Sequence, residues 1–113
     1  MKIFTKKITL EELKKMAERT FGDLVKVVVD VEKEIIVVDG ELHADEETLL
    51  INSGSKQENL WGINLYPKKT GEDFIEFDSM INLRPAYGNN SRGIDDLKIR
   101  EKIIKIVDNL IIK

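Results

Sequence analysis

Residues 24–43 read LVKVVVDVEKEIIVVDGELH, and this stretch decides the fold. Two runs of β-branched residues, one on each side of the polar pair Glu32-Lys33, predict an antiparallel β-hairpin. With that pair as the turn, the facing residues are Val27 with Val38 and Val29 with Ile36. Side chains alternate between the two faces of a strand, so these four share one face. The other face receives the polar residues Asp39, Glu41 and His43.

Three helical segments surround the hairpin. Residues 9–22 begin with the T-x-x-E spacing of a capping box and end at a glycine, as a helix C-terminus often does. Residues 44–54, ADEETLLINSG, predict a short helix with acids in its first turn. Residues 95–113 predict a longer amphipathic helix, with Leu97 and Ile104 among its inward residues. The predicted N-caps are Thr9, Asp45 and Asp95.

A second hairpin follows the second helix. Residues 59–67 (NLWGINLYP) and 73–85 (DFIEFDSMINLRP) predict the third and fourth strands, in a register that places Asn64 opposite Glu76. Their alternation gives one apolar face, made by Trp61, Ile63, Leu65, Ile75, Phe77, Ile81 and Leu83. The order α-β-β-α-β-β-α predicts a single α+β domain of two layers over residues 1–113. We expect all three helices on one face of a four-stranded antiparallel or mixed sheet.

Composition limits the classes of function. The formal net charge is −3 and the lysine pairs at 6–7, 14–15 and 68–69 are interleaved with acids, so we expect no nucleic-acid partner. No apolar run reaches the length of about 20 residues that spans a bilayer, and the first ten residues lack the pattern of a signal peptide. We therefore expect a soluble, cytoplasmic protein. The absence of cysteine excludes disulfides and thiolate metal sites, and abundant Lys and Glu favour a thermophilic source.

Four stretches carry a resemblance to a known family: GELHADEE (40–47), GSKQENLWGINLYP (54–67), FIEFDSMINLRP (74–85) and GNNSRGI (88–94). They resemble a family of small archaeal and bacterial proteins that is a domain of unknown function. The resemblance covers nearly the whole chain and implies a prokaryotic protein with one domain. It implies no activity, and it assigns no catalytic residue.

The only histidine lies in the first of these stretches. On an extended segment Glu41 and His43 point the same way, and Asp39 shares their face. A carboxylate beside an imidazole could bind a metal ion or transfer a proton, although the pattern assigns no metal. The alternative is a surface or structural role for His43. Acids in the next helical turn offset the helix dipole, so we assign them to capping. They are Asp45, Glu46 and Glu47.

The polar face of the second hairpin is another candidate. Its residues are Asn64, Glu76, Asp78, Asn82 and Arg84. Short amides and carboxylates with one arginine form a directional hydrogen-bonding set, suited to a small-molecule or protein ligand. The alternative is an ordinary solvated face or an interface.

The loop 88–93, GNNSRG, is a third candidate. Its backbone amides and Arg92 could hold an anion before the last helix. Two aspartates follow the loop and oppose an anion, so a mobile turn is the favoured interpretation.

Geometry joins the first two candidates. If both hairpins belong to one sheet with all helices on one side, His43, Asp78 and Arg84 emerge on the same open face. Nearby carboxylates would then raise the pKa of His43. We expect a non-enzymatic binding or interaction module. The alternative is a small hydrolase, with or without a metal ion, that uses Glu41 and His43 with Asp78 or Glu76.

The last helix carries more Ile and Leu residues than one sheet can cover. Ile106, Ile111 and Ile112 extend its apolar stripe, and we therefore expect a homodimer. The sequence identifies neither a cofactor nor a ligand.

Overall fold

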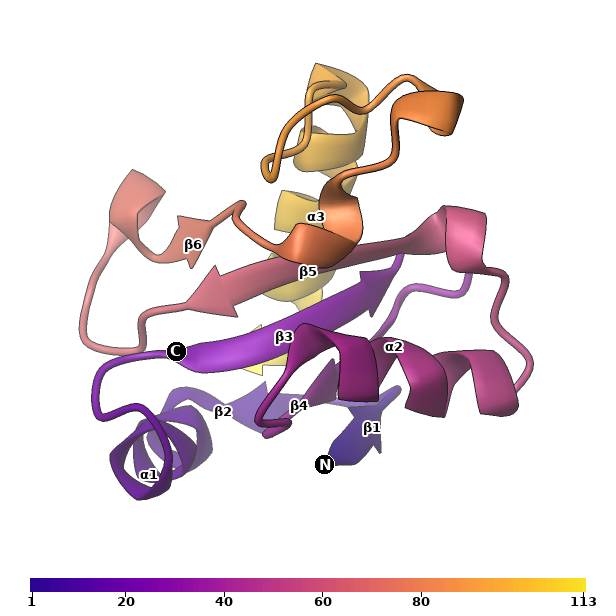
Figure 1. Cartoon of the computed structure of the whole chain (residues 1–113). Coiled ribbons are helices and arrows are strands. Elements are labelled where there is room, and N and C mark those ends of the chain that lie inside the picture. Colours follow the sequence, from indigo (N-terminus) through magenta and orange to yellow (C-terminus); the bar gives the residue numbers. More distant parts are fainter.

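The computed structural model describes residues 1–113 and has an α+β fold (Figure 1). Its five-stranded antiparallel sheet has the strand order β1-β4-β3-β5-β6, and a separate pair of short parallel strands joins β2 to β7. The helices are α1 (Leu10–Arg19), α2 (His43–Asn52) and α3 (Leu97–Leu110). The strands are β1 (Lys2–Phe4), β2 (Ile8–Thr9), β3 (Val25–Asp30), β4 (Ile35–Val38), β5 (Leu60–Leu65), β6 (Ile75–Glu76) and β7 (Ile111–Ile112). None of the helices has the length and apolar character needed to cross a membrane.

The register predicted for the first hairpin is confirmed. The pairs are Val27 with Val38 and Val29 with Ile36. The turn is longer than two residues, because Asp30 and Ile35 form the last pair and residues 31–34 connect them. The Asp30 carboxylate accepts hydrogen bonds from the backbone N–H groups of Glu32 and Lys33, at 2.9 and 3.0 Å. This carboxylate fixes the turn, which the polar letters alone could not reveal.

The first helix also forms as predicted. The Thr9 hydroxyl accepts from the Glu12 backbone N–H at 3.1 Å, and the Glu12 carboxylate accepts from the Thr9 N–H, which completes the capping box. Gly22 has φ +90° and follows the helix end.

The other two predicted N-caps are wrong. Helix α2 begins at His43, and its N-cap Leu42 makes no side-chain cap, so Asp45 lies inside the first turn. Helix α3 is capped by Asp96, whose carboxylate accepts from the Lys98 N–H at 2.8 Å. Asp95 instead accepts hydrogen bonds from the preceding loop. Asp96 lies beside the equally suitable Asp95, so composition could not choose between them, whereas Leu42 is a poor N-cap residue that no capping preference would have selected.

The helices do not share one face of the sheet, so the two-layer prediction is wrong. Helices α1 and α3 contribute to the larger core with the apolar face of Trp61 and Ile63. Helix α2 covers the opposite face, where its Leu50 packs with Val28 and Val37 of the sheet. In Figure 1, α2 lies in front of the sheet and α3 behind it. The apolar residues on both faces of β3 explain this arrangement, since a strand covered on both sides lacks a polar face.

The sheet has five strands, because β1 pairs with β4 and was not predicted. The predicted fourth strand is shorter than its sequence pattern. The pair Asn64–Glu76 is confirmed, but β6 ends at Glu76 and residues 80–82 form the 3-10 helix η3 (Met80–Asn82). Phe77 packs half-buried against the larger core, whereas Ile81 packs on the opposite face. Leu83 is exposed.

Helix α3 buries only part of its predicted stripe. Leu97 and Ile104 are exposed, with 69% and 40% of their surface accessible, so their inward assignment is wrong. Ile106 and Ile111 are buried in the chain's own core, and of the three residues offered for a homodimer only Ile112 is exposed.

Candidate functional site

The first turn of α2 faces the sheet and carries two buried ionisable residues. His43 is 8% exposed and Glu46, three positions later on the same helix face, is fully buried. The assignment of Glu46 to capping is therefore wrong, because its carboxyl group is buried and accepts from the Gly40 N–H and not from its own helix. His43 lies at a helix start because Asp39, with φ +67°, ends the extended strand before it.

His43 is anchored through one ring nitrogen. Its Nε2 lies 2.7 Å from the backbone oxygen of Ile63, and because a carbonyl only accepts, Nε2 carries the proton. Burial lowers the pKa of His43, against the opposing effects of this hydrogen bond and of the Asp78 carboxylate. The expected rise in its pKa is thus wrong, since loss of hydration outweighs the nearby carboxylate. The neutral ring keeps a lone pair on Nδ1, which makes no hydrogen bond within the chain.

Glu46 is held by the backbone at the end of the first hairpin. Its Oε2 accepts from the Gly40 N–H at 3.0 Å, while Oε1 is buried and has no partner. A Cβ at Gly40 would lie 2.5 Å from the Glu46 Cγ, so only glycine permits this approach. Burial raises the pKa of Glu46 to about 9, and the carboxyl group is protonated at neutral pH.

Asn64 on β5 links this region to the edge of the sheet. Its side chain is buried, with 7% exposed, and its Nδ2 donates to Glu76 Oε1 at 2.8 Å and to the Asp78 backbone oxygen at 3.3 Å. The Tyr66 hydroxyl donates to the same Glu76 oxygen at 3.2 Å. The Asn64 Oδ1 is buried without a donor.

An ion pair between Arg92 and Asp78 adjoins Asn64, which donates to the Asp78 backbone oxygen. Arg92 Nε donates to Asp78 Oδ1 at 2.7 Å, and both side chains are about half exposed. The charges of Asp78 and Arg92 both act on the pKa of His43, as does the charge of Lys26, which faces Asn64 across β3 and β5. His43, Asn64, Glu76, Asp78 and Arg92 therefore form one cluster, which we call the polar site.

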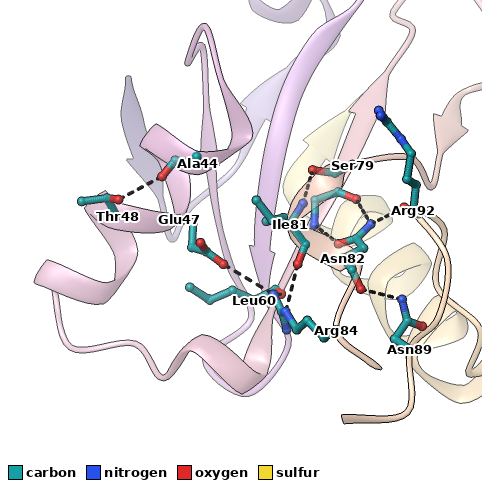
Figure 2. A network of polar contacts seen from close by, with 11 residues as sticks. Ala44, Glu47, Thr48, Leu60, Ser79, Ile81, Asn82, Arg84, Asn89 and Arg92 are labelled. Carbon is teal, nitrogen blue, oxygen red and sulfur yellow. Dashed lines mark hydrogen bonds and ion pairs between the residues drawn. The ribbon is translucent and has the colours of Figure 1, made fainter. Parts of the chain in front are cut away.

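Asn82 and Arg84 are engaged with the chain itself (Figure 2). Asn82 is fully buried; its Oδ1 accepts from the Gly62 N–H at 2.8 Å, and its Nδ2 donates to the Gly62 oxygen at 2.9 Å and to the Arg92 oxygen at 2.9 Å. Arg84 donates to the backbone oxygens of Ile81, at 2.9 Å, and of Leu60. Its guanidinium also lies 3.5 Å from the Glu47 carboxylate of α2. These contacts hold the segment after β6 against β5.

Of the candidate residues, Glu41 lies outside the polar site. Glu41 is exposed in the turn before α2 and makes no hydrogen bond or ion pair within the chain. The loop that contains Arg92 is organised by Asn89, which the sequence did not single out. Asn89 is buried and donates to the backbone oxygens of Asn82, Ser91 and Gly93, and its Oδ1 accepts from the Asp95 N–H.

Lys26 and Glu46 are members or neighbours of the site that the sequence did not single out. Lys26 is the one polar residue between apolar strand positions, which was a usable signal. Glu46 lay among acids that a helix start explains equally well. No group of three or more His, Asp and Glu side chains is placed to hold a metal ion. Within the polar site, Asn64 Oδ1 and His43 Nδ1 are acceptors that have no donor in the chain.

Comparison with curated proteins gives no match, and comparison with solved structures gives none either. A family model described as a protein of unknown function, DUF5674, matches residues 2–110. The expected resemblance to a domain of unknown function is confirmed by this match. The chain belongs to the DUF5674 family, for which no function is described.

Proposed function

We propose that this domain is a non-enzymatic binding module whose polar site takes a small ligand rich in N–H or O–H donors. The observation that carries the proposal is the Oδ1 atom of Asn64, which is buried without a donor. An unsatisfied buried acceptor destabilises a fold by about 1–3 kcal/mol. Most buried acceptors in proteins are therefore hydrogen-bonded to the protein, to water or to a ligand. A donor supplied by a ligand would complete it.

The neighbouring atoms support the same class of ligand. The neutral His43 offers a second free acceptor at Nδ1, and the Glu76 and Asp78 carboxylates, which are bonded to Asn64 and Arg92, offer further acceptors. Because Asn64 Oδ1 and His43 Nδ1 can only accept hydrogen bonds, the complementary ligand supplies N–H or O–H donors, as an amine or a polyol does. Binding rather than catalysis is favoured because the carboxylates are already paired, Glu76 with Asn64 and Asp78 with Arg92.

The test is an NMR titration of labelled protein with four probes. Putrescine and glycerol present donors, whereas acetate and inorganic phosphate present mainly acceptors at neutral pH. We expect saturable shifts of the Asn64 side-chain amide and the His43 ring with the first two probes only. Asn64→Ala should abolish them, and Asn52→Ala, on the exposed end of α2, should not.

A second variant keeps the test decisive if Asn64→Ala unfolds. His43→Gln can retain a donor to the Ile63 oxygen while it removes the Nδ1 acceptor, so it should weaken binding in a folded protein. If neither donor probe shifts these resonances, or if both variants bind like the wild type, the proposed ligand class is wrong.

The second candidate function is a small hydrolase. It is favoured by one observation, the neutral His43 ring with Nε2 anchored and Nδ1 free, which is the state a general base needs. The Nδ1 would take a proton from water as that water attacks an ester carbonyl and return it to the alkoxide as the ester C–O bond breaks, with Glu41 and either Asp78 or Glu76 as the partner carboxylates. Hydrolysis of p-nitrophenyl acetate by wild type and His43→Gln tests this. Equal rates would refute it.

We also propose a prokaryotic and thermophilic source and a cytoplasmic location, on the composition and family features given above. A homodimer stays a prediction that now rests on Ile112 and the exposed part of α3. Light scattering over a concentration series tests it, and a strict monomer at high concentration would refute it.

A further inference from the structure

The face of the sheet opposite the polar site carries a groove of about 790 Å³ between β6 and α3. Its apolar lining consists of Phe74, Ile75, Phe77, Leu97 and Ile104. Leu97 and Ile104 are the two large apolar residues of α3 that are exposed to solvent. We call this depression the apolar groove. Its volume falls within the range of about 300–1,000 Å³ that is common for sites binding small molecules.

A second depression of about 390 Å³ adjoins the groove and is lined by four lysines. They are Lys14 of α1, Lys68 and Lys69 of the turn between β5 and β6, and Lys113. No acidic side chain lines it, and of the four only Lys113 has an ion pair, a 3.9 Å contact with Asp108 between two half-exposed side chains. In the sequence these lysines are separated by acids, but the fold brings them together on a chain of net charge −3. We call this depression the lysine pocket.

The two depressions share part of their lining. Phe74 and Lys113 line both of them, and the Lys113 Nζ lies 4.6 Å from the centre of the Phe74 ring. An apolar groove therefore lies next to a cluster of cationic groups.

We propose that the apolar groove and the lysine pocket together bind one single-chain anionic amphiphile, with its carboxylate or phosphate head among the lysines and its hydrocarbon tail along α3. An anion alone would leave the apolar groove empty, and an apolar ligand alone would leave the lysines unpaired. Charge also orients the ligand. Three carboxylates and two cationic groups line the groove, whereas the pocket is cationic throughout, so the head belongs at the lysine end.

The site is independent of the polar site, because the two lie on opposite faces of the sheet. The probe for the test is dodecanoate below its micellar concentration, measured by calorimetry and by NMR on the full chain. We expect saturable one-to-one binding, with shifts at Leu97 and Ile104 and at the turn that contains Lys68. Acetate and inorganic phosphate should bind at least tenfold more weakly, and so should dodecyltrimethylammonium.

Two pairs of variants separate the head from the tail. Lys68→Glu/Lys69→Glu should weaken dodecanoate binding at least tenfold, while Lys15→Glu/Lys56→Glu makes the same charge change outside the pocket and should leave it unchanged. Ile104→Asn should weaken it too. The matched control is Ile51→Asn on α2, because both isoleucines are 40% exposed and their substitutions disturb the core equally little.

Four results would overturn the proposal. Equal binding of the cationic surfactant would remove the role of the lysines, and equal binding of inorganic phosphate would remove the role of the tail. Binding to phosphatidylglycerol vesicles without binding to monomeric dodecanoate would assign the surface to a membrane. A dimer in light scattering that dodecanoate does not dissociate would assign the groove to a second copy of the chain.

Discussion

Glu46 should make the stability of this protein fall as the pH rises from 5 to 8. Its pKa is about 9 in the folded protein and 4.5 in an exposed glutamate, because the carboxyl group is fully buried under α2. Between these two values the folded state binds one proton more than the unfolded state. Each pH unit therefore lowers the free energy of unfolding by about 1.4 kcal/mol. At pH 7 the accumulated loss relative to pH 4.5 is about 3 kcal/mol.

The substitution Glu46→Gln removes this titration and keeps the shape of the side chain. The amide oxygen can accept from the Gly40 N–H as the carboxyl oxygen does, and the amide nitrogen replaces the buried Oε1, which has no partner in either case. We therefore expect the variant to be more stable than the wild type at pH 7 and about equally stable at pH 5. The control is Glu41→Gln, since Glu41 is exposed and makes no hydrogen bond or ion pair within the chain.

Urea unfolding at pH 5, 6, 7 and 8, followed by circular dichroism, measures the three profiles. The difference between Glu46→Gln and the wild type should grow by about 1.4 kcal/mol per pH unit, while Glu41→Gln should run parallel to the wild type. Parallel profiles for Glu46→Gln and the wild type would show that Glu46 is ionised in the folded state. That result would refute the account of its burial.

Three further predictions concern the site and the sheet. In an NMR titration, His43 should protonate below pH 6.5. The substitution Asp78→Asn should lower the pKa of His43 further, because the Asp78 carboxylate stabilises the imidazolium. Identical titration curves for the wild type and the variant would mean that the two groups do not interact. Since a lowered histidine pKa weakens the fold only in acid, this residue should reduce stability below pH 6.5 and not above it. Phe77→Ala should lower the free energy of unfolding by about 1–3 kcal/mol in urea, less than for a fully buried ring. Asn82→Ala should lower it by about 2–4 kcal/mol, because three backbone groups lose their partner, whereas Asn52→Ala should change it by less than about 0.5 kcal/mol.

The first hairpin could be predicted to the residue because its register follows from alternation, and every apolar residue in it agrees with one pairing. The end of the second hairpin, where β6 stops at Glu76, could not be predicted in this way. Residues 77–83 alternate as a strand would, but the Asn82 side chain takes the hydrogen bonds that a strand backbone would make with Gly62. A pattern of apolar and polar letters contains no information about which atom of a residue makes the bond.

The layer arrangement was predictable in part. Val28 and Val37 lie on the second face of the hairpin, and as apolar residues they require an element that covers this face. Of the site, His43 and its proximity to Asp78 were anticipated from strand parity, but His43 reaches that position as a helix residue. Glu46 could not be anticipated, because burial by tertiary packing decides whether an acid in a first turn is a cap or a buried carboxyl group.

The contact between Asn82 and Gly62 also bears on self-association. An exposed strand edge offers free N–H and C=O groups to any other extended chain, and this is how many folded proteins begin to aggregate. Strand β6 covers the outer edge of β5 over two residues only, and the rest of that edge could pair with another chain. At Gly62, however, the backbone N–H and C=O are both already bonded to the side-chain amide of Asn82. An amide side chain cannot be extended as a template in the way a strand can. Asn82 thus ends the ladder, and its loss would expose a pairing site on the fully buried strand β5 at the high protein concentrations found in a cell.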